Sequence, residues 1–159
     1  MNPINRRHAI ALLAGTTLVT LLPSALMAAA LTPAPAKITV HKTPWCGCCT
    51  GWSAHLRDAG FDVTELKHDD LAPIKARLGV PVALESCHTA EVGGYAIEGH
   101  VPAADIIKLL ADRPKALGLA VPGMPMGSPG MEMGSDRDAY DVVLFDAQTS
   151  TVFTRYPAR

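Results

Sequence analysis

Three cysteines within four residues constrain this chain more than any other feature of its sequence. They are Cys46, Cys48 and Cys49, in the run WCGCC, and they follow an alternating, β-branched stretch, residues 37–41 (KITVH), that predicts a strand. Neighbouring cysteines form a disulfide only with strain, because the bond needs Cα atoms about 5.5 Å apart. The run is therefore a poor disulfide framework, and we interpret it as a reactive or metal-binding site.

The first 30 residues have the pattern of a secretory signal. Arg6 and Arg7 precede an uncharged, mostly apolar stretch, residues 9–22, and the alanines at 28–30 offer a cleavage site. The apolar stretch is shorter than the ~20 residues of a spanning helix, so no stable membrane insertion is expected after cleavage. The paired arginines leave both the Sec and the twin-arginine export routes open. The expected organisation is a signal peptide at 1–30, a Pro/Ala linker at 31–36 and one domain at 37–159.

The charge balance gives no indication of nucleic-acid binding. Among 159 residues, 14 are lysine or arginine and 15 are aspartate or glutamate, so no basic face is expected. A chain of this length can bury an ordinary hydrophobic core without cross-links. The three clustered cysteines and the fourth, Cys87, are therefore free for chemistry.

The remaining patterns predict an α/β fold. A helix is expected from the cysteine run to Gly60, with Trp52, Leu56 and Ala59 on its buried face. Residues 118–134, which contain four methionines and three prolines, have neither helical nor strand periodicity and are expected to form a loop. The other expected elements are strands at 61–66, 86–91 and 95–98, helices at 71–78 and 103–111, and a hairpin at 141–145 and 152–156.

The order expected over residues 37–113, β-α-β-α-β-β-α, resembles the thioredoxin fold. Thioredoxins carry W-C-G-P-C where this chain has WCGCC, with Cys48 at the place of the proline. The resemblance implies that the third strand begins, and the fourth strand ends, at the cysteine end of the sheet. We therefore expect Cys87, His88 and His100 to lie beside the clustered cysteines. His41, His55 and His68 are interpreted as solvated or structural residues.

The cysteine pattern favours metal binding over disulfide exchange. A helix N-terminus acidifies thiols, which makes them good metal ligands as well as good nucleophiles. A third thiol, Cys48, would compete by internal exchange with a disulfide between Cys46 and Cys49. A thiol–disulfide oxidoreductase, with Cys46 as nucleophile and Cys49 as resolving thiol, stays open as an alternative.

The methionine-rich segment adds soft ligands to this set. Met124 and Met126, followed by Met131 and Met133, lie among glycines and prolines, and a segment of about 17 residues is long enough to return to the cysteines. Filling of surface gaps is the other interpretation of these methionines. Thiolate, thioether and imidazole together select copper(I), while zinc, which accepts cysteine and histidine, is the main rival metal.

Three long motifs in this chain are similar to those of the periplasmic copper-resistance proteins called CopG, a family long described as a domain of unknown function. The motifs are TPWCGCCTGW (43–52), SCHTAEVGGYAIEGHVP (86–102) and GLAVPGMPMGSPGM (118–131). The resemblance implies a periplasmic, thioredoxin-like domain that binds a cysteine-bridged cluster of several copper ions. By position, the implied cluster ligands are Cys46, Cys48, Cys49 and Cys87, and the further candidates are His88, His100, Met124 and Met126.

The same resemblance implies a role in copper tolerance that includes interconversion of Cu(I) and Cu(II). The implied partners are copper ions and a periplasmic copper exporter or carrier. Passive binding of the metal is favoured over enzymatic turnover, and the choice between carrier, buffer and copper oxidoreductase stays open.

Overall fold

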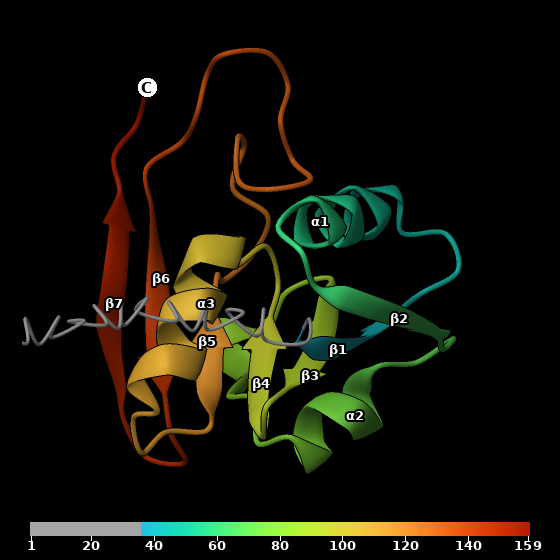
Figure 1. Ribbon diagram of the computed structural model, residues 1–159, viewed down its shortest axis with the longest axis vertical. Helices are drawn as coiled ribbons and strands as arrows, with labels where there is room; N and C mark the ends of the chain where they lie inside the picture. The colour runs from blue at the N-terminus through green and yellow to red at the C-terminus, as the bar shows by residue number, and fades with distance from the viewer. Residues whose placement is uncertain (1–35) are drawn as a thin grey trace, which may run out of the picture. The chain divides into compact units, whose positions relative to one another are not determined.

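The computed structural model describes residues 36–159, which contain one seven-stranded sheet and three α-helices (Figure 1). Most of the expected linker and the whole expected signal peptide lie outside these residues. No helix within residues 36–159 is both long and apolar enough to cross a membrane. The elements are β1 (Lys37–Lys42), α1 (Gly47–Asp58), β2 (Asp62–Lys67), α2 (Ala72–Arg77), the short 3-10 helix η1 (Val82–Leu84), β3 (His88–Val92), β4 (Tyr95–Glu98), α3 (Ala103–Asp112), β5 (Gly118–Ala120), β6 (Tyr140–Phe145) and β7 (Ser150–Tyr156). The order of the strands in the sheet is β2-β1-β3-β4-β5-β6-β7.

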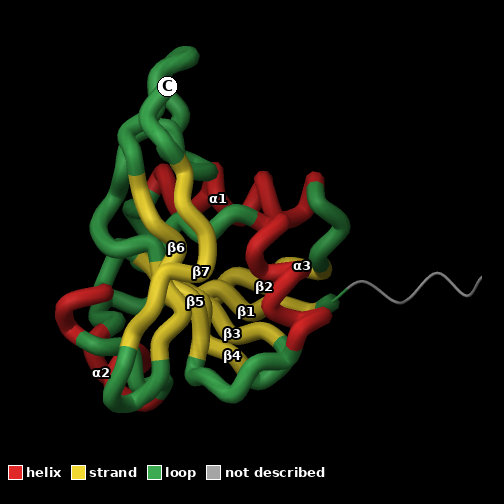
Figure 2. Tube along the Cα trace, turned by 90° about the vertical axis from the view of Figure 1, so that its left-hand side faces the viewer, coloured by secondary structure: helices red, strands yellow, loops and turns green. Residues whose placement is uncertain are grey.

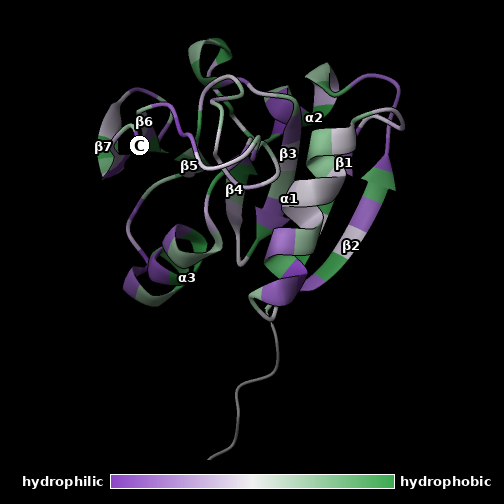
Figure 3. Cartoon of the chain, turned by 90° about the horizontal axis from the view of Figure 1, so that it is seen from above, coloured by the Kyte–Doolittle hydropathy of each residue, from purple (hydrophilic) through white to green (hydrophobic). Residues whose placement is uncertain are grey.

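Helices α1 and α3 supply the apolar cover for one face of the sheet. Trp52 and Leu56 of α1 and Ile106 and Leu109 of α3 are fully buried in the main core, at the spacing that puts residues on one side of a helix. Figure 3 shows these two helices on the same side of the strands. Ala59 was expected on the buried face of α1 but is exposed, because the helix ends one residue earlier.

Helix α2 lies on the opposite face of the sheet from α3 (Figure 2). Polar side chains meet it there. Its Lys75 forms an ion pair with Glu98 at the end of β4 and donates a hydrogen bond to Thr89 of β3 at 3.0 Å. The Glu98 carboxylate, which is fully buried, also accepts the backbone N–H of Ser86 at 2.6 Å. Buried charges persist only where such partners surround them, so this network fixes Ser86 beside the end of β4.

The strand directions place the end of β1, the start of β3 and the end of β4 at the same edge of the sheet, as expected. Strand β1 pairs in parallel with β2 and antiparallel with β3, and β3 pairs antiparallel with β4. The predicted order β-α-β-α-β-β-α is confirmed. Strand β3 begins at His88 and not at Ser86 as expected, because the N–H of Ser86 bonds to Glu98 instead of joining the ladder. Cys87 therefore lies in the turn immediately before β3.

Strand β5 was not predicted, because residues 118–134 were expected to be a loop throughout. Its three residues are too few to show a period of two, yet they pair in parallel with β4 and antiparallel with β6. A Cβ atom on Gly118 would lie 1.8 Å from the carbonyl oxygen of Ala96, so the close strand pairing requires glycine here. Because β5 runs parallel to β4, it returns the chain to the cysteine end of the sheet.

A side chain from α1 caps the N-terminus of helix α3. The residue before its first turn is Pro102, which has no side-chain acceptor, and the N–H of Ala103 donates to Nε2 of His55 at 3.0 Å. This hydrogen bond requires a lone pair on Nε2 and therefore a neutral ring. Burial lowers the pKa of His55, while the carboxylates of Glu132 and Asp58 oppose that shift.

Replacing His55 by alanine is expected to lower the free energy of unfolding by about 1 kcal/mol, because the N–H of Ala103 loses its acceptor. Glutamine offers an amide oxygen in place of Nε2 and is expected to restore part of this loss. The folded-state pKa of His55 lies below its unfolded value near 6.5, so the unfolded chain binds more protons as the pH falls through 6.5, and stability is lost over that range. Denaturant titrations at pH 7.5 and 5.5 should show a larger loss in the wild type than in His55→Gln. An equal loss in both proteins would contradict this role.

Candidate metal centre

Four sulfur atoms gather where β1 ends and where α1 and β3 begin. The Sγ atoms of Cys46, Cys48, Cys49 and Cys87 lie within 4.8 Å of one another. Sγ of Cys48 is 3.5 Å from Sγ of Cys46 and 3.8 Å from Sγ of Cys87, and Sγ of Cys49 is 3.6 Å from Sγ of Cys87. Cys46 is the N-cap of α1, and Cys48 and Cys49 belong to its first turn. The geometry therefore joins the clustered cysteines to the distant Cys87, as expected.

The structure contains a disulfide between Cys46 and Cys49, and it leaves Cys48 and Cys87 as free thiols. The Cα atoms of the bonded pair are 5.4 Å apart, which is an ordinary span for a disulfide. The expectation of a poor disulfide framework is therefore wrong for this pair, because the first turn of α1 brings residues three apart into bonding range. The expected strain applies only to a disulfide between the adjacent residues Cys48 and Cys49. The structure therefore shows the site in its oxidised form.

Two imidazoles adjoin the sulfurs through Cys87. Sγ of Cys87 lies 3.3 Å from Nδ1 of His88 and 3.1 Å from Nε2 of His100, and both rings are fully buried. Nδ1 of His100 donates to the carbonyl oxygen of Pro129 at 2.8 Å. Because that nitrogen holds the ring hydrogen, Nε2 of His100 presents its lone pair toward the sulfur of Cys87.

Burial keeps both of these imidazoles neutral. It lowers the pKa of His88 well below the usual range, and the neighbouring His100 and Lys75 lower it further. Burial also lowers the pKa of His100, against the opposing effect of its hydrogen bond to Pro129. Nε2 of His88 has no hydrogen-bond partner among the described residues, which is rare for a buried polar atom. Neutral imidazole is the form that binds metal ions, so both rings fit a ligand role.

Cys87 is a half-buried free thiol beside the start of α1. Burial, followed by the influence of the neighbouring Cys48, raises the pKa of Cys87 to about 12. Its sulfur is therefore protonated at neutral pH in the metal-free chain. A metal ion that binds this sulfur has to displace the proton.

The methionine loop, defined as residues 121–134, is held against the site near its end. Gly51 and Gly130 touch through their backbones, and a Cβ atom added to Gly130 would lie 2.6 Å from the carbonyl oxygen of Cys48 and 2.5 Å from the amide nitrogen of Trp52. Figure 1 shows this orange segment crossing from β5 to α1 before it turns back to β6. This contact could not be predicted from the sequence, since a close approach of two distant glycines leaves no periodic signal.

The same loop is also held near its beginning. The hydroxyl of Ser86 donates to the carbonyl oxygen of Gly123, immediately beside Cys87. Met124 and Met126 therefore lie on a short segment that is fixed to the walls of the site at both ends. Met124 is exposed and Met126 is half-buried. Of the other two methionines, Met131 is half-buried and Met133 is exposed.

Gly130→Ala is expected to push the methionine loop away from α1 and to lower the unfolding midpoint. Gly134→Ala is the matched control, because Gly134 has φ +89° against +83° for Gly130, yet its Cβ would meet nothing within 4 Å. Both variants carry the left-handed backbone penalty of about 1–2 kcal/mol, and Gly130→Ala adds the clash with α1. Thermal unfolding of the two variants measures the difference. Equal midpoints would show that the glycine contact contributes nothing.

The remaining described histidines lie outside the sulfur site. His55 caps α3, which is the structural role that was expected. His41 and His68 contact each other, with Nδ1 of His41 3.0 Å from Nε2 of His68.

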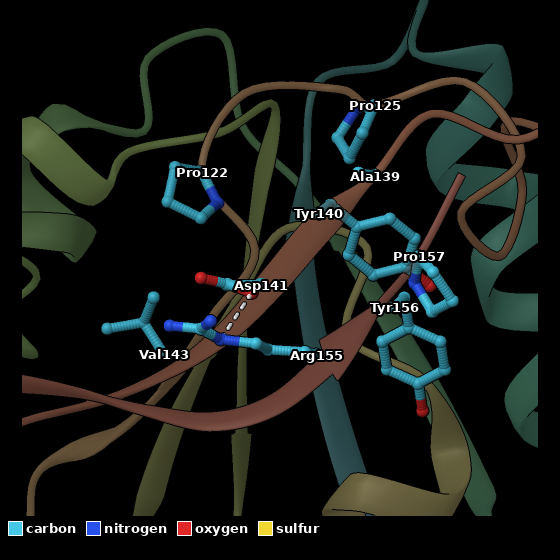
Figure 4. Close-up of a pocket in the computed structure, with 9 residues that line it drawn as sticks. All are labelled: Pro122, Pro125, Ala139, Tyr140, Asp141, Val143, Arg155, Tyr156 and Pro157. Carbon is cyan, nitrogen blue, oxygen red and sulfur yellow. Dashed lines mark ion pairs between the residues drawn. The ribbon is translucent and has the colours of Figure 1, made fainter.

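An open groove of about 700 Å³ lies between the β6–β7 hairpin and the start of the methionine loop (Figure 4). Pro122 borders it, the rings of Tyr140 and Tyr156 stack with centroids 4.8 Å apart, and Arg155 pairs with Asp141 at 3.6 Å. None of the described residues that line this groove carries a thiol or an imidazole, so it is not part of the candidate metal centre.

Comparison with known proteins gives two kinds of match. Residues 84–131 match a family model described as "Protein of unknown function, DUF411". A solved structure named "Copper resistance protein copG- Form 2" is 49% identical, with a TM-score of 0.74, over 77% of this chain and 99% of that chain. The "Form 1" structure is 50% identical, with a TM-score of 0.74, over 77% of this chain and 98% of that chain. The chain belongs to the CopG copper-resistance family. No curated protein matches it.

Membership of the CopG family confirms the resemblance drawn from the three motifs. The family match spans Cys87, His88, His100 and the first part of the methionine loop, and it ends before Met133. The three clustered cysteines precede the residues of that match, and the two CopG structures match most of the described chain.

Proposed function

We propose that this chain binds copper in the periplasm and acts in copper resistance, with more than one copper ion held on a cysteine-bridged site. The observation that carries this proposal is the convergence of four sulfur atoms and two neutral imidazoles from three separate segments. The identity of about half of the aligned residues with two structures named copper resistance protein supports copper as the metal.

The sulfur spacing supports shared ions in the reduced site. Two thiolates bound to one ion at about 2.3 Å, with a tetrahedral angle between them, lie about 3.8 Å apart. The separations of Cys48 from Cys87 and of Cys49 from Cys87, 3.8 Å and 3.6 Å, are close to this value. A sulfur with several such neighbours can bridge ions. We assign Cys46, Cys48, Cys49 and Cys87 as the bridging ligands, after reduction of the disulfide.

The remaining donors favour copper(I) over zinc. His88 and His100 reach the site through Cys87, and we propose that they complete the coordination at that end. Met124 and Met126 lie on the tethered segment of the methionine loop, and we propose that their thioethers serve as outer soft ligands. A thioether has little affinity for zinc, whereas copper(I) accepts thiolate, thioether and imidazole together.

The cellular setting of the proposal rests on the sequence. The signal pattern of residues 1–30 supports export, and with the family it supports a periplasmic location after cleavage. In that compartment the chain would take up copper ions and hand them to an exporter or carrier. The formal net charge of −1 offers no support for nucleic acid as a partner.

Replacing Cys48 by proline tests the role of the extra cysteine. The variant restores the W-C-G-P-C pattern, and we expect it to lose multinuclear copper binding because the bridge between Cys46 and Cys87 is gone. Metal analysis of the reduced, copper(I)-loaded chain should show several ions in the wild type and at most one in the variant. Met133→Leu, which changes an exposed methionine, is the control and should keep the wild-type count. An unchanged number of copper ions per chain in Cys48→Pro would contradict this assignment.

We propose a second function, reduction of copper(II), for the pair Cys46 and Cys49, because their disulfide shows that the two sulfurs lie within bonding range. Oxidation of these two thiols to a disulfide releases two electrons and two protons. The two electrons reduce two copper(II) ions to copper(I), which is the form that the remaining soft ligands prefer. The site would then act as a copper oxidoreductase for as long as another thiol system reduced the disulfide again.

Anaerobic mixing of the fully reduced chain with copper(II) tests this second function. We expect two copper(I) ions, detected with a copper(I)-specific chelator, for each Cys46–Cys49 disulfide found by peptide mapping. Cys46→Ser removes the pair and should lower the copper(I) yield by two ions per chain. The same yield from wild type and variant would contradict the assignment. Reduction of a protein disulfide such as that of insulin in metal-free buffer would instead favour a thiol–disulfide oxidoreductase.

A further inference from the structure

A second group of metal-binding side chains lies on the face of the sheet that α2 covers. His41 of β1 pairs in register with Thr89 of β3, while the ring of His88 packs on the opposite face, 4.4 Å from the ring of Trp52. His68 directly follows β2, and its N–H donates to the carbonyl oxygen of Lys42 at 3.0 Å. This hydrogen bond extends the parallel pairing of β1 and β2 by one step and brings the two histidines side by side.

We propose that Nδ1 of His41 and Nε2 of His68 together bind a divalent transition-metal ion, at a site distinct from the sulfur centre. The two nitrogens are 3.0 Å apart, and their ring centroids are 5.1 Å apart with the planes tilted by 41°. Two imidazole nitrogens bound to one ion at about 2.0–2.1 Å lie about 2.9 Å apart for a right angle and about 3.4 Å apart for a tetrahedral angle. The observed separation falls within this range without movement of either backbone.

The carboxylate of Glu91 determines which ring nitrogen of His41 carries a hydrogen. Oε1 of Glu91 lies 2.9 Å from Nε2 of His41, and Arg77 binds the same carboxylate through both terminal nitrogens, at 2.7 Å and 3.3 Å. The hydrogen bond from Arg77 lowers the pKa of Glu91, so the group is an anion and can only accept. Nε2 of His41 therefore carries the ring hydrogen, and Nδ1 directs its lone pair toward His68.

A metal ion can replace the hydrogen that the two rings share. With that tautomer of His41, Nε2 of His68 carries the hydrogen of the 3.0 Å contact between the two rings. When the hydrogen of His68 moves to its other ring nitrogen, both facing nitrogens carry a lone pair, and rotation of the rings lets the two lone pairs bind one ion. The pairing of Glu91 with the outer nitrogen of His41 is the arrangement that orients metal-bound histidines in many proteins.

The donors and their exposure define the class of ion. The side chain of His41 is 7% exposed, whereas His68 is half-buried and leaves one side open for water ligands. Imidazole ligands without carboxylate or thiolate suit zinc, nickel and copper(II) over calcium and magnesium, and they do not select copper(I). The sheet would therefore carry a borderline divalent ion on one face and soft ligands on the other.

Zinc titration, followed by NMR detection of histidine ring nitrogens, tests the proposal. The protein is the mature chain with all four cysteines changed to serine, so that thiols do not compete. We expect the Nδ1 signal of His41 and the Nε2 signal of His68 to shift with one equivalent of zinc, while the His55 signals stay in place. His68→Gln should abolish these shifts, and Glu91→Gln should weaken zinc binding by about tenfold. Asp69→Asn, a change in an exposed neighbour of His68, is the control and should bind as before.

If the serine variant does not fold, the same ring signals are followed in the wild-type chain with its disulfide intact. Zinc bound at the sulfur centre then shifts the signals of His88 and His100, whereas zinc at the proposed site shifts those of His41 and His68. Unchanged His41 and His68 signals in the folded protein, or the same zinc affinity in His68→Gln, would overturn the proposal. Either result leaves the copper proposal untouched, because the two sites share no residue.

Discussion

The carboxylate of Glu98 holds the functional end of the sheet together. It is fully buried, pairs with Lys75, and accepts hydrogen bonds from the hydroxyl of Thr89 and the N–H of Ser86. Ser86 precedes Cys87, and Glu98 lies two residues before His100, so one side chain sets the spacing of two ligand-bearing segments. Burial raises the pKa of Glu98, and the charge of Lys75 opposes that shift. Removal of either charge would leave the other buried without its partner.

Much of this arrangement could be predicted, because strand direction and strand order follow from local patterns. The β-branched alternation around residues 37–41 and the apolar spacing of Trp52 and Leu56 were enough to place the cysteines where a strand meets a helix. Antiparallel pairing of the third strand then brings Cys87 to them from about 40 residues away in the sequence. The features that were missed are those with no period: the three-residue strand β5 and the backbone contact of Gly51 with Gly130.

The chemistry of the sulfurs was harder to predict than their positions. The first turn of α1 places Cys46 and Cys49 at the distance of a disulfide and also places Cys48 between Cys46 and Cys87. The sequence distinguishes these outcomes poorly, since one geometry serves both bond formation and shared metal binding. Redox state decides between them, while burial lowers the pKa of both histidines beside Cys87.

The contact between Gly51 and Gly130 also determines how the methionine loop can move. Two backbones that touch have no side chain between them that could change rotamer and absorb a displacement of either backbone. A free pivot lies further out, at Gly134, where the backbone has positive φ and the space around the missing Cβ is empty. Any movement of the methionine loop toward α1 at Gly130 would therefore press on the peptide group that carries the carbonyl oxygen of Cys48.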